Sequence, residues 1–560
     1  MPERYWCRKV VTWEAVVDRS GHPVSLIPLA SDNEKAASVL LVPDIQRTSG
    51  VRPFLLCDNA EYWLGMDKKR GKEKQDQSIS FHESVLHNID DDGAVAAIRF
   101  LKLMKDPSQR GPMEDLIENP KGFIVLRLLN DDRYIHERSA IRAAWVDYRR
   151  KQEDNLSKGT CLVTGNNGPY ALLFPQITGL AGAQSSGASL VSCNADSFSS
   201  YGQKVSTAGA ISADAADKVG AALSYVLKDS AHRIRVGNDY IAFWTDSVDS
   251  SIDQDLALFI DPDELARGEN EQVRGAIQTS LFELRKGSPP VPIPDNVQYH
   301  LLGIAPYQAR LAVRFYESGS LGELQKHVIQ FLKDTEMTGV NPCSMRCYIN
   351  QTALQGDAKN VPMTLVSSCM KALIHGTAFP TSLPQKIIAR TRIDKGSVNP
   401  WDMGRRAAIL KACLIRKART AGHGQGQEME RSLTVGLNNE NGNQGYLLGR
   451  LFALLEKAQL DAIGGANATI RDRYMGAAAT TPALVYPQLL KLAQHHISKA
   501  ERGTFIDKQV QQVMGKMGDK GFPKTLSFDD QGLFYIGYYQ QKQAIYQRKA
   551  DDGPNDAQED

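Results

Sequence analysis

Two pairs of residues have side chains that can bind metal ions, and neither pair completes a site. His82 and His87 lie in a segment similar to a zinc protease motif, but they are five residues apart, whereas two ligands on one helix face must be four apart. Cys343 and Cys347 have the spacing of one helix face, but no second pair of Cys or His follows nearby, as a structural zinc site requires. We therefore predict no metal site.

Motifs that cradle phosphates or activate a nucleophile are also missing. The chain has no G-x-x-x-x-G-K-[ST] loop and no G-x-S-x-G elbow. The glycines at 422, 424 and 426 follow no strand and indicate a flexible link rather than a dinucleotide site. Residues 90–93, Asp-Asp-Asp-Gly, could hold a cation, but this pattern favours the cap of the following helix. The sequence therefore predicts no catalytic residue and no cofactor.

One loop, within residues 176–202, has little side-chain bulk and many polar groups. Its glycines let the backbone approach a groove or a phosphate closely, and its glutamine and serines supply hydrogen-bond donors. These residues are Gly179, Gly182, Gln184, Ser185, Ser186 and Gly187. The pattern suits contact with a polyanion, although a flexible surface loop would have the same composition.

A first basic segment, residues 68–74, holds five cations, with Asp67 and Glu73 as its acidic neighbours. A run of charge is usually a solvated loop. If the protein holds duplex DNA, the same run would clamp its phosphates. The candidates for phosphate contact are Lys68, Lys69, Arg70 and Lys72.

A second basic segment, residues 386–420, has ten Lys or Arg and two Asp, a local net charge of +8 by subtraction. Ile409, Leu410 and Leu414 would form the apolar side of an amphipathic helix, with the cations outward. This arrangement would present the cations to a polyanion outside the helix. The candidates are Arg405, Arg406, Arg416, Lys417 and Arg419.

The elements that must position these residues belong to a long chain of ordinary globular composition. Its 560 residues predict several domains, and 66 Lys plus Arg against 64 Asp plus Glu give a net charge of +2. No global field therefore attracts a polyanion or a membrane, so any nucleic-acid surface must be local. No apolar run reaches the ~18 residues of a membrane span. Eight scattered cysteines without C-x-x-C favour reduced thiols, and we expect a cytoplasmic protein.

The pattern changes along the chain and predicts an α+β fold. Residues 1–385 alternate short runs rich in branched and aromatic side chains with helical periods, which indicates a mixed α and β region. Residues 386–427 form the basic segment and its link. Residues 428–550 are predicted to form a bundle of about four helices, because the pattern is helical from Leu447 almost to the end, with several apolar stripes. The acidic tail, residues 551–560, is expected to be disordered.

Aromatic residues fall into two groups with different expected roles. A cluster near the C-terminus could stack bases, but its helical spacing favours core or a subunit interface. Its members are Phe534, Tyr535, Tyr538, Tyr539 and Tyr546. The tryptophans Trp63, Trp145, Trp244 and Trp401 are expected in the core or in an interface.

Four blocks together resemble one known family, the large subunit of the type I-C CRISPR surveillance complex, Cascade. The blocks are PFLLCDNAEYWLG at 53–65, AQSSGA at 183–188 with VS at 191–192 and SYG at 200–202, LGIAP at 302–306 with Arg310 and VRF at 313–315, and GYLLGRLF at 445–452. They occur in the right order and cover nearly the whole chain. One departure is Thr178, where the family's loop would carry a basic residue.

The resemblance implies a non-catalytic subunit of a guide-RNA complex. Such a subunit contacts the guide RNA and the handle-binding and backbone subunits, tests the short motif that flanks a double-stranded target, starts strand separation beside the displaced single strand, and recruits the helicase-nuclease. Residues 1–385 would recognise the flanking motif through Gly179–Gly187, and no membrane is involved. In this family a small subunit arises from an internal start in the same gene, and Met429 would leave the predicted bundle whole.

Two other functions remain open at this point. A stand-alone metal-dependent nuclease would need a cluster of metal-binding carboxylates. A purely structural scaffold would not contact DNA, so charge reversal in the basic segments would leave target affinity unchanged.

Overall fold

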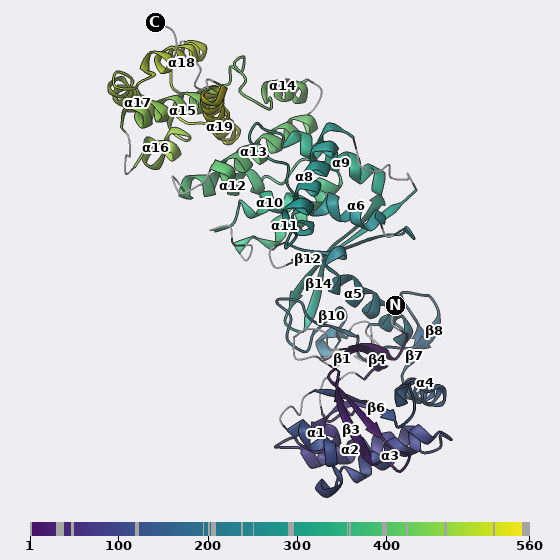
Figure 1. Ribbon diagram of the computed structural model, residues 1–560. Helices are drawn as coiled ribbons and strands as arrows, with labels where there is room; N and C mark the ends of the chain where they lie inside the picture. The colour runs from purple at the N-terminus through teal and green to yellow at the C-terminus, as the bar shows by residue number, and fades with distance from the viewer. Residues whose placement is uncertain are drawn as a thin grey trace. The chain divides into compact units, whose positions relative to one another are not determined.

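The computed structural model forms two compact units along the chain (Figure 1). Unit 1 comprises Met1–Tyr225 with Pro306–Leu311, and unit 2 comprises Val226–Ala305 with Ala312–Asp560. The structure describes residues 3–29, 38–45, 47, 50–117, 122–193, 195–199, 202, 209–236, 239–249, 251–288, 296–354, 357, 360–394, 400–421, 424–463, 468–518 and 521–551. The predicted boundaries at 385, 427 and 550 stay predictions.

Unit 1 is built around a four-stranded sheet. Its strand order is β3 (Pro23–Pro28), β2 (Trp13–Val17), β6 (Phe123–Leu128) and β5 (Cys57–Asn59), with β2 and β6 parallel and the outer pairs antiparallel. Branched and aromatic residues fill the two central strands because both of their faces are buried. A two-stranded ribbon, β1 (Trp6–Val11) with β4 (Ser38–Pro43), pairs antiparallel beside it.

Helices of unit 1 bury their apolar sides in one core. They are α1 (Ala60–Trp63), α2 (Gly71–Leu86), α3 (Asp92–Leu103) and α4 (Ser139–Asp154). Trp63 meets Phe100 edge to face at 5.8 Å, and Trp145 lies in the same core. The carboxylate of Asp91 accepts the N–H groups of Gly93 at 2.8 Å and Ala94 at 3.2 Å. The cap predicted for residues 90–93 is therefore confirmed.

The remainder of unit 1 is made of short strands and one helix. These elements are β7 (Lys158–Thr160), β8 (Asn167–Pro169), β9 (Gln176–Ile177), β10 (Ala188–Ser189) and most of α5 (Ala213–Lys228). Strand β7 pairs antiparallel with β8, and β9 with β10. The chain between β9 and β10 is the predicted glycine loop. Ser200 and Tyr201 of the SYG block lie outside the described residues.

Unit 2 begins with antiparallel strands covered by helices on one face. Strands β11 (Arg233–Val236), β12 (Asp239–Thr245), β13 (Gln298–Tyr307) and β14 (Arg310–Ser320) are successive neighbours. Phe243, Leu301 and Phe315 point to one face, where they share a core with leucines of three helices. These helices are α6 (Ser251–Ile260), α8 (Glu271–Lys286) and α9 (Leu321–Asp334).

The rest of unit 2 is helical, so the predicted α+β organisation is confirmed. The longer helices are α11 (Met363–Ile374), α12 (Ser382–Asp394), α13 (Pro400–Thr420) and α14 (Gln425–Ser432), and α7 (Pro262–Leu265) and α10 (Met345–Asn350) are short. Residues 422 and 423 of the predicted link, Lys395, and residues 552–560 of the acidic tail lie outside the described residues. Gln425–Gln427 of that link form the first turn of α14.

The C-terminal bundle has five helices in the described part of the chain, not about four. They are α15 (Gln444–Ala462), α16 (Ile470–Ala478), α17 (Pro482–Ile497), α18 (Gly503–Met517) and α19 (Phe528–Asp551). Helix α15 is buried on every side from Gly445 to Ala458. Gly449 faces α19 so closely that a Cβ there would lie 1.9 Å from the Phe534 carbonyl oxygen. Short α16 was missed because its few apolar residues form no stripe of their own.

The aromatic cluster of α19 lies in this core. Phe534, Tyr535, Tyr538 and Tyr539 are buried, while Tyr546 is exposed. Phe452 of α15 packs against Phe534 at 5.9 Å and Tyr538 at 6.0 Å. The core interpretation of the four buried rings is confirmed, and their burial leaves no free ring face for a base.

Candidate nucleic-acid interface

The glycine loop of unit 1 has a defined conformation. Strands β9 and β10 pair at its base, and the N–H of Gly187 donates to the carbonyl of Gln184 at 2.9 Å, which closes a tight turn. Gly179, Gly182 and Gly187 have φ values of 81°, 92° and 102°. Residues that carry a side chain rarely adopt such φ values, so the backbone conformation at these three positions favours glycine.

The tip of the β13–β14 hairpin, which also belongs to unit 1, fastens this loop. The N–H of Gln184 donates to the carbonyl of Gln308 at 3.0 Å, and the N–H of Gln308 donates to the carbonyl of Gly182 at 3.0 Å. The N–H of Ser189 donates to the carbonyl of Ala309 at 2.9 Å. Both ends of the turn are therefore held by backbone hydrogen bonds.

The fastened turn presents polar side chains to solvent. Gln184, Ser185 and Ser186 are exposed, and the neighbouring hairpin tip adds exposed Tyr307. Sequence reasoning missed Tyr307 and Gln308. The sequence could have pointed to them, because both residues lie between the LGIAP block and Arg310. In the structure, that block lies next to the AQSSGA block.

The first basic segment forms a fixed turn that leads into α2. Gly65 has a φ of 68°, and a Cβ on Gly71 would lie 2.0 Å from the Gly65 carbonyl oxygen. The carboxylate of Asp67 accepts the N–H groups of Lys69 at 2.8 Å and Arg70 at 2.7 Å, and the Lys74 ammonium at 2.6 Å. These hydrogen bonds, that of Lys74 foremost, hold the pKa of Asp67 well below its usual range.

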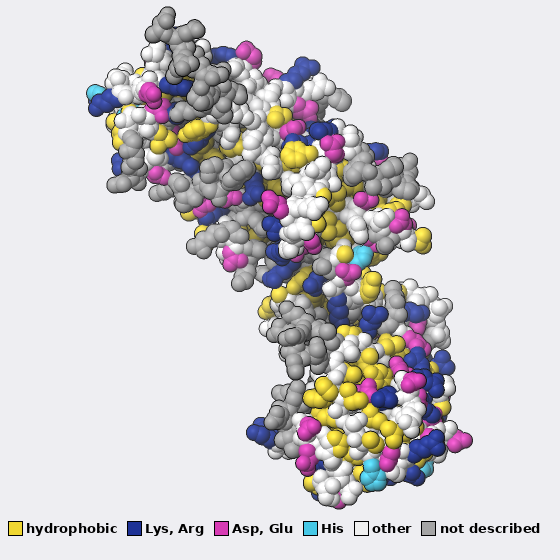
Figure 2. Space-filling model, in the orientation of Figure 1, with side chains coloured by type: hydrophobic (Ala, Val, Ile, Leu, Met, Phe, Trp, Pro, Cys, Tyr) yellow, Lys and Arg dark blue, Asp and Glu magenta, His cyan; other side chains and the backbone are white. Residues whose placement is uncertain are grey.

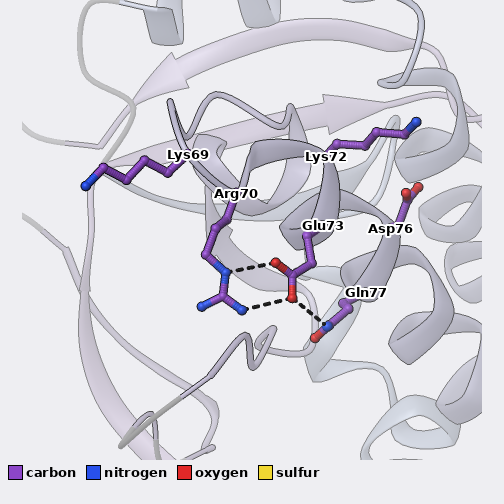
Figure 3. Close-up of a pocket in the computed structure, with 6 residues that line it drawn as sticks. All are labelled: Lys69, Arg70, Lys72, Glu73, Asp76 and Gln77. Atoms are coloured by element: carbon purple, nitrogen blue, oxygen red, sulfur yellow. Dashed lines mark hydrogen bonds and ion pairs between the residues drawn. The ribbon is translucent and has the colours of Figure 1, made fainter.

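The exposed cations of this turn differ in their partners (Figure 3). Arg70 donates twice to the Glu73 carboxylate, both at 2.8 Å, so its charge is shared. Lys69 and Lys72 point away from that pair and line an open depression of about 510 Å³ with Asp76 and Gln77. Within the described residues, Lys68, Lys69 and Lys72 have no acidic partner. Only these three lysines are therefore fully available to a phosphate.

The prediction that the cations of α13 face outward is wrong for Arg406 and Arg416. The Arg416 side chain is 1% exposed, its Nε donates to Asp334 at 2.9 Å, and one terminal nitrogen donates to the carbonyls of Ala372 and Thr377, both at 3.1 Å. Buried Arg406 pairs with Asp394 at 2.7 Å. Helices α9, α12, α14 and α19 pack against α13, so its polar side is also enclosed.

Among the remaining cations of α13, Lys411 is buried and its ammonium donates to the Glu336 carbonyl at 2.6 Å, whereas Arg405, Lys417 and Arg419 are accessible but paired. Arg419 bridges Asp334, at 2.6 Å, and Glu430 of α14. Lys417 is 60% exposed and pairs with Asp529 of α19 at 2.6 Å. Arg405 lies 3.7 Å from Asp402. The second basic segment thus holds helices of unit 2 together, and among the described cations of α13 only Arg405, Lys417 and Arg419 keep solvent contact.

No single sign of charge dominates the visible surface. Figure 2 shows Lys and Arg interspersed with Asp and Glu over both units. This agrees with the net charge of +2 and means that any nucleic-acid contact must be made by local features.

Comparison with known protein families identifies the chain. A family model described as CRISPR-associated protein (Cas_Csd1) matches residues 1–546. The chain belongs to this family. It is therefore a large subunit of the type I-C class, and this membership implies a Cascade complex with other CRISPR-associated subunits and a guide RNA. No curated protein matches the chain.

In a chain of the Cas_Csd1 family, the glycine loop and the lysine turn of unit 1 are candidate contacts to nucleic acid. Thr178 is exposed at the start of the glycine loop, and the loop has no cation between Gln176 and Ser189. Among the described residues, no three His, Cys, Asp or Glu side chains gather as a metal site. The same part of the chain contains no helix that is long and apolar enough to cross a membrane.

Proposed function

We propose that the chain is the non-catalytic Cascade subunit that tests the short motif flanking a DNA target. The observation that carries this proposal is the glycine loop, fastened by Gln308 on both sides, with Gln184, Ser185 and Ser186 exposed on its turn. Guide RNA reads the long target by base pairing, so protein must read only a few base pairs of duplex. A narrow loop with exposed donors suits the minor groove, where acceptors are presented at every base pair.

The lysine turn before α2 would position the duplex without reading its sequence. Lys68, Lys69 and Lys72 are exposed and lack acidic partners among the described residues. Contacts to phosphates fix the register of a protein on DNA, and contacts to base edges specify the sequence. The lysine turn would therefore contact phosphates, and the glycine loop would read base edges. The opened duplex would then form an R-loop with the guide RNA.

The partners follow from the same proposal. The chain would dock on the handle-binding and backbone subunits, contact the guide RNA and the displaced strand, and recruit the helicase-nuclease that cuts. A small subunit from the same gene would begin at Met429, inside α14, and would retain α15–α19 complete.

The reading role can be tested with a target library whose flanking positions are randomised. Complex reconstituted with the wild-type chain should enrich a short motif, and the triple variant Gln184→Ala, Ser185→Ala, Ser186→Ala should flatten this enrichment while copurifying with guide RNA. Gln109→Ala, an exposed glutamine elsewhere in unit 1, is the matched control and should enrich normally. Wild-type enrichment by the triple variant, or its failure to assemble, would overturn the assignment of the loop.

The non-catalytic role needs a separate test. Purified chain incubated with Mg²⁺ or Mn²⁺ should leave labelled single-stranded and duplex DNA intact. Metal-dependent cleavage that survives further purification would instead support the nuclease alternative.

A further inference from the structure

Three aromatic rings form a ladder across neighbouring strands of unit 2. Trp244 of β12 stacks on His300 of β13 with ring centroids 5.3 Å apart and planes inclined by 23°. His300 stacks on Tyr316 of β14 at 6.1 Å and 14°. Trp244 and His300 are direct partners in the antiparallel register, and the Tyr316 hydroxyl lies 2.8 Å from His300 Nδ1. The register and this hydrogen bond fix the spacing and tilt of the rings.

The ladder lies on the face that the helices of unit 2 leave uncovered. The alternate residues Phe243, Leu301 and Phe315 point to the opposite face and are buried. Tyr316 is 53% exposed, whereas Trp244 and His300 are half-buried because each is stacked. None of the three rings is needed to fill the core.

One end of the ladder is open. Strand β14 pairs with β13 on one side, and on its other side the described part of the chain pairs with it only at Arg310, through β10. At Tyr316 it is therefore an edge strand. The ring of Tyr316 meets His300 through its hydroxyl edge, and its large exposed area leaves a ring face accessible. A further flat ring could stack on this face.

Positive charge lies beside this open end. Arg314 precedes Tyr316 by two residues on β14, and its side chain is 41% exposed although its Nε lies 4.0 Å from buried Asp239. The neighbouring acid of β14, Glu317, is held on the other face by Lys371 at 3.3 Å and His375 at 2.9 Å. Asp246, near Trp244, accepts the N–H of Gln298 at 2.9 Å. The open end thus combines a ring face with a cation.

We propose that Tyr316 stacks an unpaired nucleobase of a single strand, with Arg314 contacting an adjacent phosphate. Aromatic stacking beside a cation binds single strands with little sequence preference because every base has a π face. This site goes beyond the proposed reading of duplex DNA and does not use the glycine loop. Guide RNA and the displaced DNA strand share the required chemistry, and the test separates them.

The test measures binding of the full chain to fluorescent oligo-dT and oligo-U of ten nucleotides by anisotropy. Tyr316→Ala should weaken binding by roughly 5- to 100-fold, as expected for one stacked base. Tyr316→Phe keeps the ring and should stay within about twofold of wild type. Tyr225→Ala, an exposed tyrosine of α5, is the matched control and should bind as wild type does. The tighter of the two oligonucleotides identifies the RNA or DNA source.

Charge and location are tested with the same strands. Arg314→Gln should reduce the slope of log K against log salt by about 0.7, the value for one phosphate of a single strand. A strand carrying 5-iodouracil should crosslink under ultraviolet light to the peptide that contains Tyr316, a readout that needs no variant to fold. Normal binding by Tyr316→Ala, loss of binding by Tyr316→Phe, or a crosslink confined to another peptide would overturn the proposal. Normal binding by the Gln184 triple variant is expected and separates this site from the glycine loop.

Discussion

The N–H of Gln184 donates to the carbonyl of Gln308 at 3.0 Å, and this backbone hydrogen bond fastens the glycine loop to a hairpin tip that is distant in the sequence. Gln308 itself has a φ of 52°, a conformation that a non-glycine residue adopts only when its surroundings hold it there. The two backbone hydrogen bonds to Gln184 and Gly182 supply that constraint. Reading by the loop should therefore depend on the backbone at 308 rather than on its side chain.

Substitutions at 308 separate these contributions. Gln308→Gly keeps both hydrogen bonds and relieves the positive φ, so duplex affinity of the complex should stay within about threefold of wild type. Gln308→Pro removes the N–H and imposes a negative φ, and affinity should fall by about tenfold or more. Gly187→Val should behave like the proline variant, because a Cβ there would lie 2.9 Å from the Ile177 carbonyl oxygen. Equal binding by the glycine and proline variants would show that the hairpin tip does not support the loop.

The lysine turn should act through phosphates. Replacing Lys68, Lys69 and Lys72 together by Gln should make the slope of log K against log salt shallower by about 3 units, because each phosphate contact to duplex DNA contributes roughly 0.9 to that slope. Arg70→Gln should change the slope by well under one unit, because Arg70 is already paired with Glu73. Titration of duplex binding between low and moderate salt measures both slopes. A flattening below one unit for the triple variant would mean that the turn is only solvated.

Two buried histidines should make unit 1 sensitive to acid. His82 donates through Nδ1 to the Ser78 carbonyl at 2.7 Å and accepts the N–H of Leu56 through Nε2 at 3.0 Å, so it is neutral, and burial lowers its pKa to about 4. Burial also lowers the pKa of His136 to about 4. The unfolded chain binds more protons between pH 6.5 and 4, so stability is complete above pH 6.5 and is lost as the pH falls through 4.

The expected loss is roughly 3 kcal/mol for each histidine over that pH range. Denaturation of the full chain at a series of pH values measures it, and His82→Gln should remove about one proton from the pH slope. His87→Gln is the matched control, since His87 is exposed, and should leave the slope unchanged. An unchanged slope in His82→Gln would show that His82 does not titrate with folding.

Cations of α13 should matter for stability more than for DNA. Asp334 is buried and accepts both Arg416 and Arg419, so Asp334→Asn should destabilise unit 2 by about 3 kcal/mol, as expected for a broken buried ion pair. Arg405→Gln, which affects a partly exposed side chain, should change stability by less than about 0.5 kcal/mol. Chemical denaturation followed by circular dichroism compares the two. A similarly small loss of stability in Asp334→Asn and in Arg405→Gln would mean that the buried ion pair of Asp334 contributes little to the stability of unit 2.

The order of elements was predictable from the sequence because it rests on local hydrophobic patterns. Alternating and helical periods place β6 and α15 without knowledge of the fold. The burial of Arg416 was not predictable, because its partner Asp334 belongs to a distant helix and an apolar stripe shows only one side of α13. Trp244 was expected in the core or an interface, and only strand register shows that it stacks on His300. The hold of Gln308 on the glycine loop likewise depends on long-range backbone pairing.

A start at Met429 should produce a second polypeptide that contains the bundle. Such a product would retain α15–α19, whose close packing at Gly449 and Gly537 needs no residue before α15, and the side chain of Asn443 would still cap α15 by accepting the N–H of Tyr446 at 3.2 Å. It would lose α13, and with it the pair between Lys417 and Asp529. A start at Met475 would instead remove α15, the helix around which the bundle is built.

Mass spectrometry of the purified complex should therefore find a peptide that begins at Met429 or Glu430. Recoding Met429→Leu should abolish this product and spare the full chain, because Met429 is only partly buried and leucine conserves its volume. Met475→Leu is the matched control and should leave the product in place. Complex without the product should bind opened DNA less tightly if copies of the bundle line the displaced strand. Persistence of the peptide after recoding Met429 would move the start elsewhere.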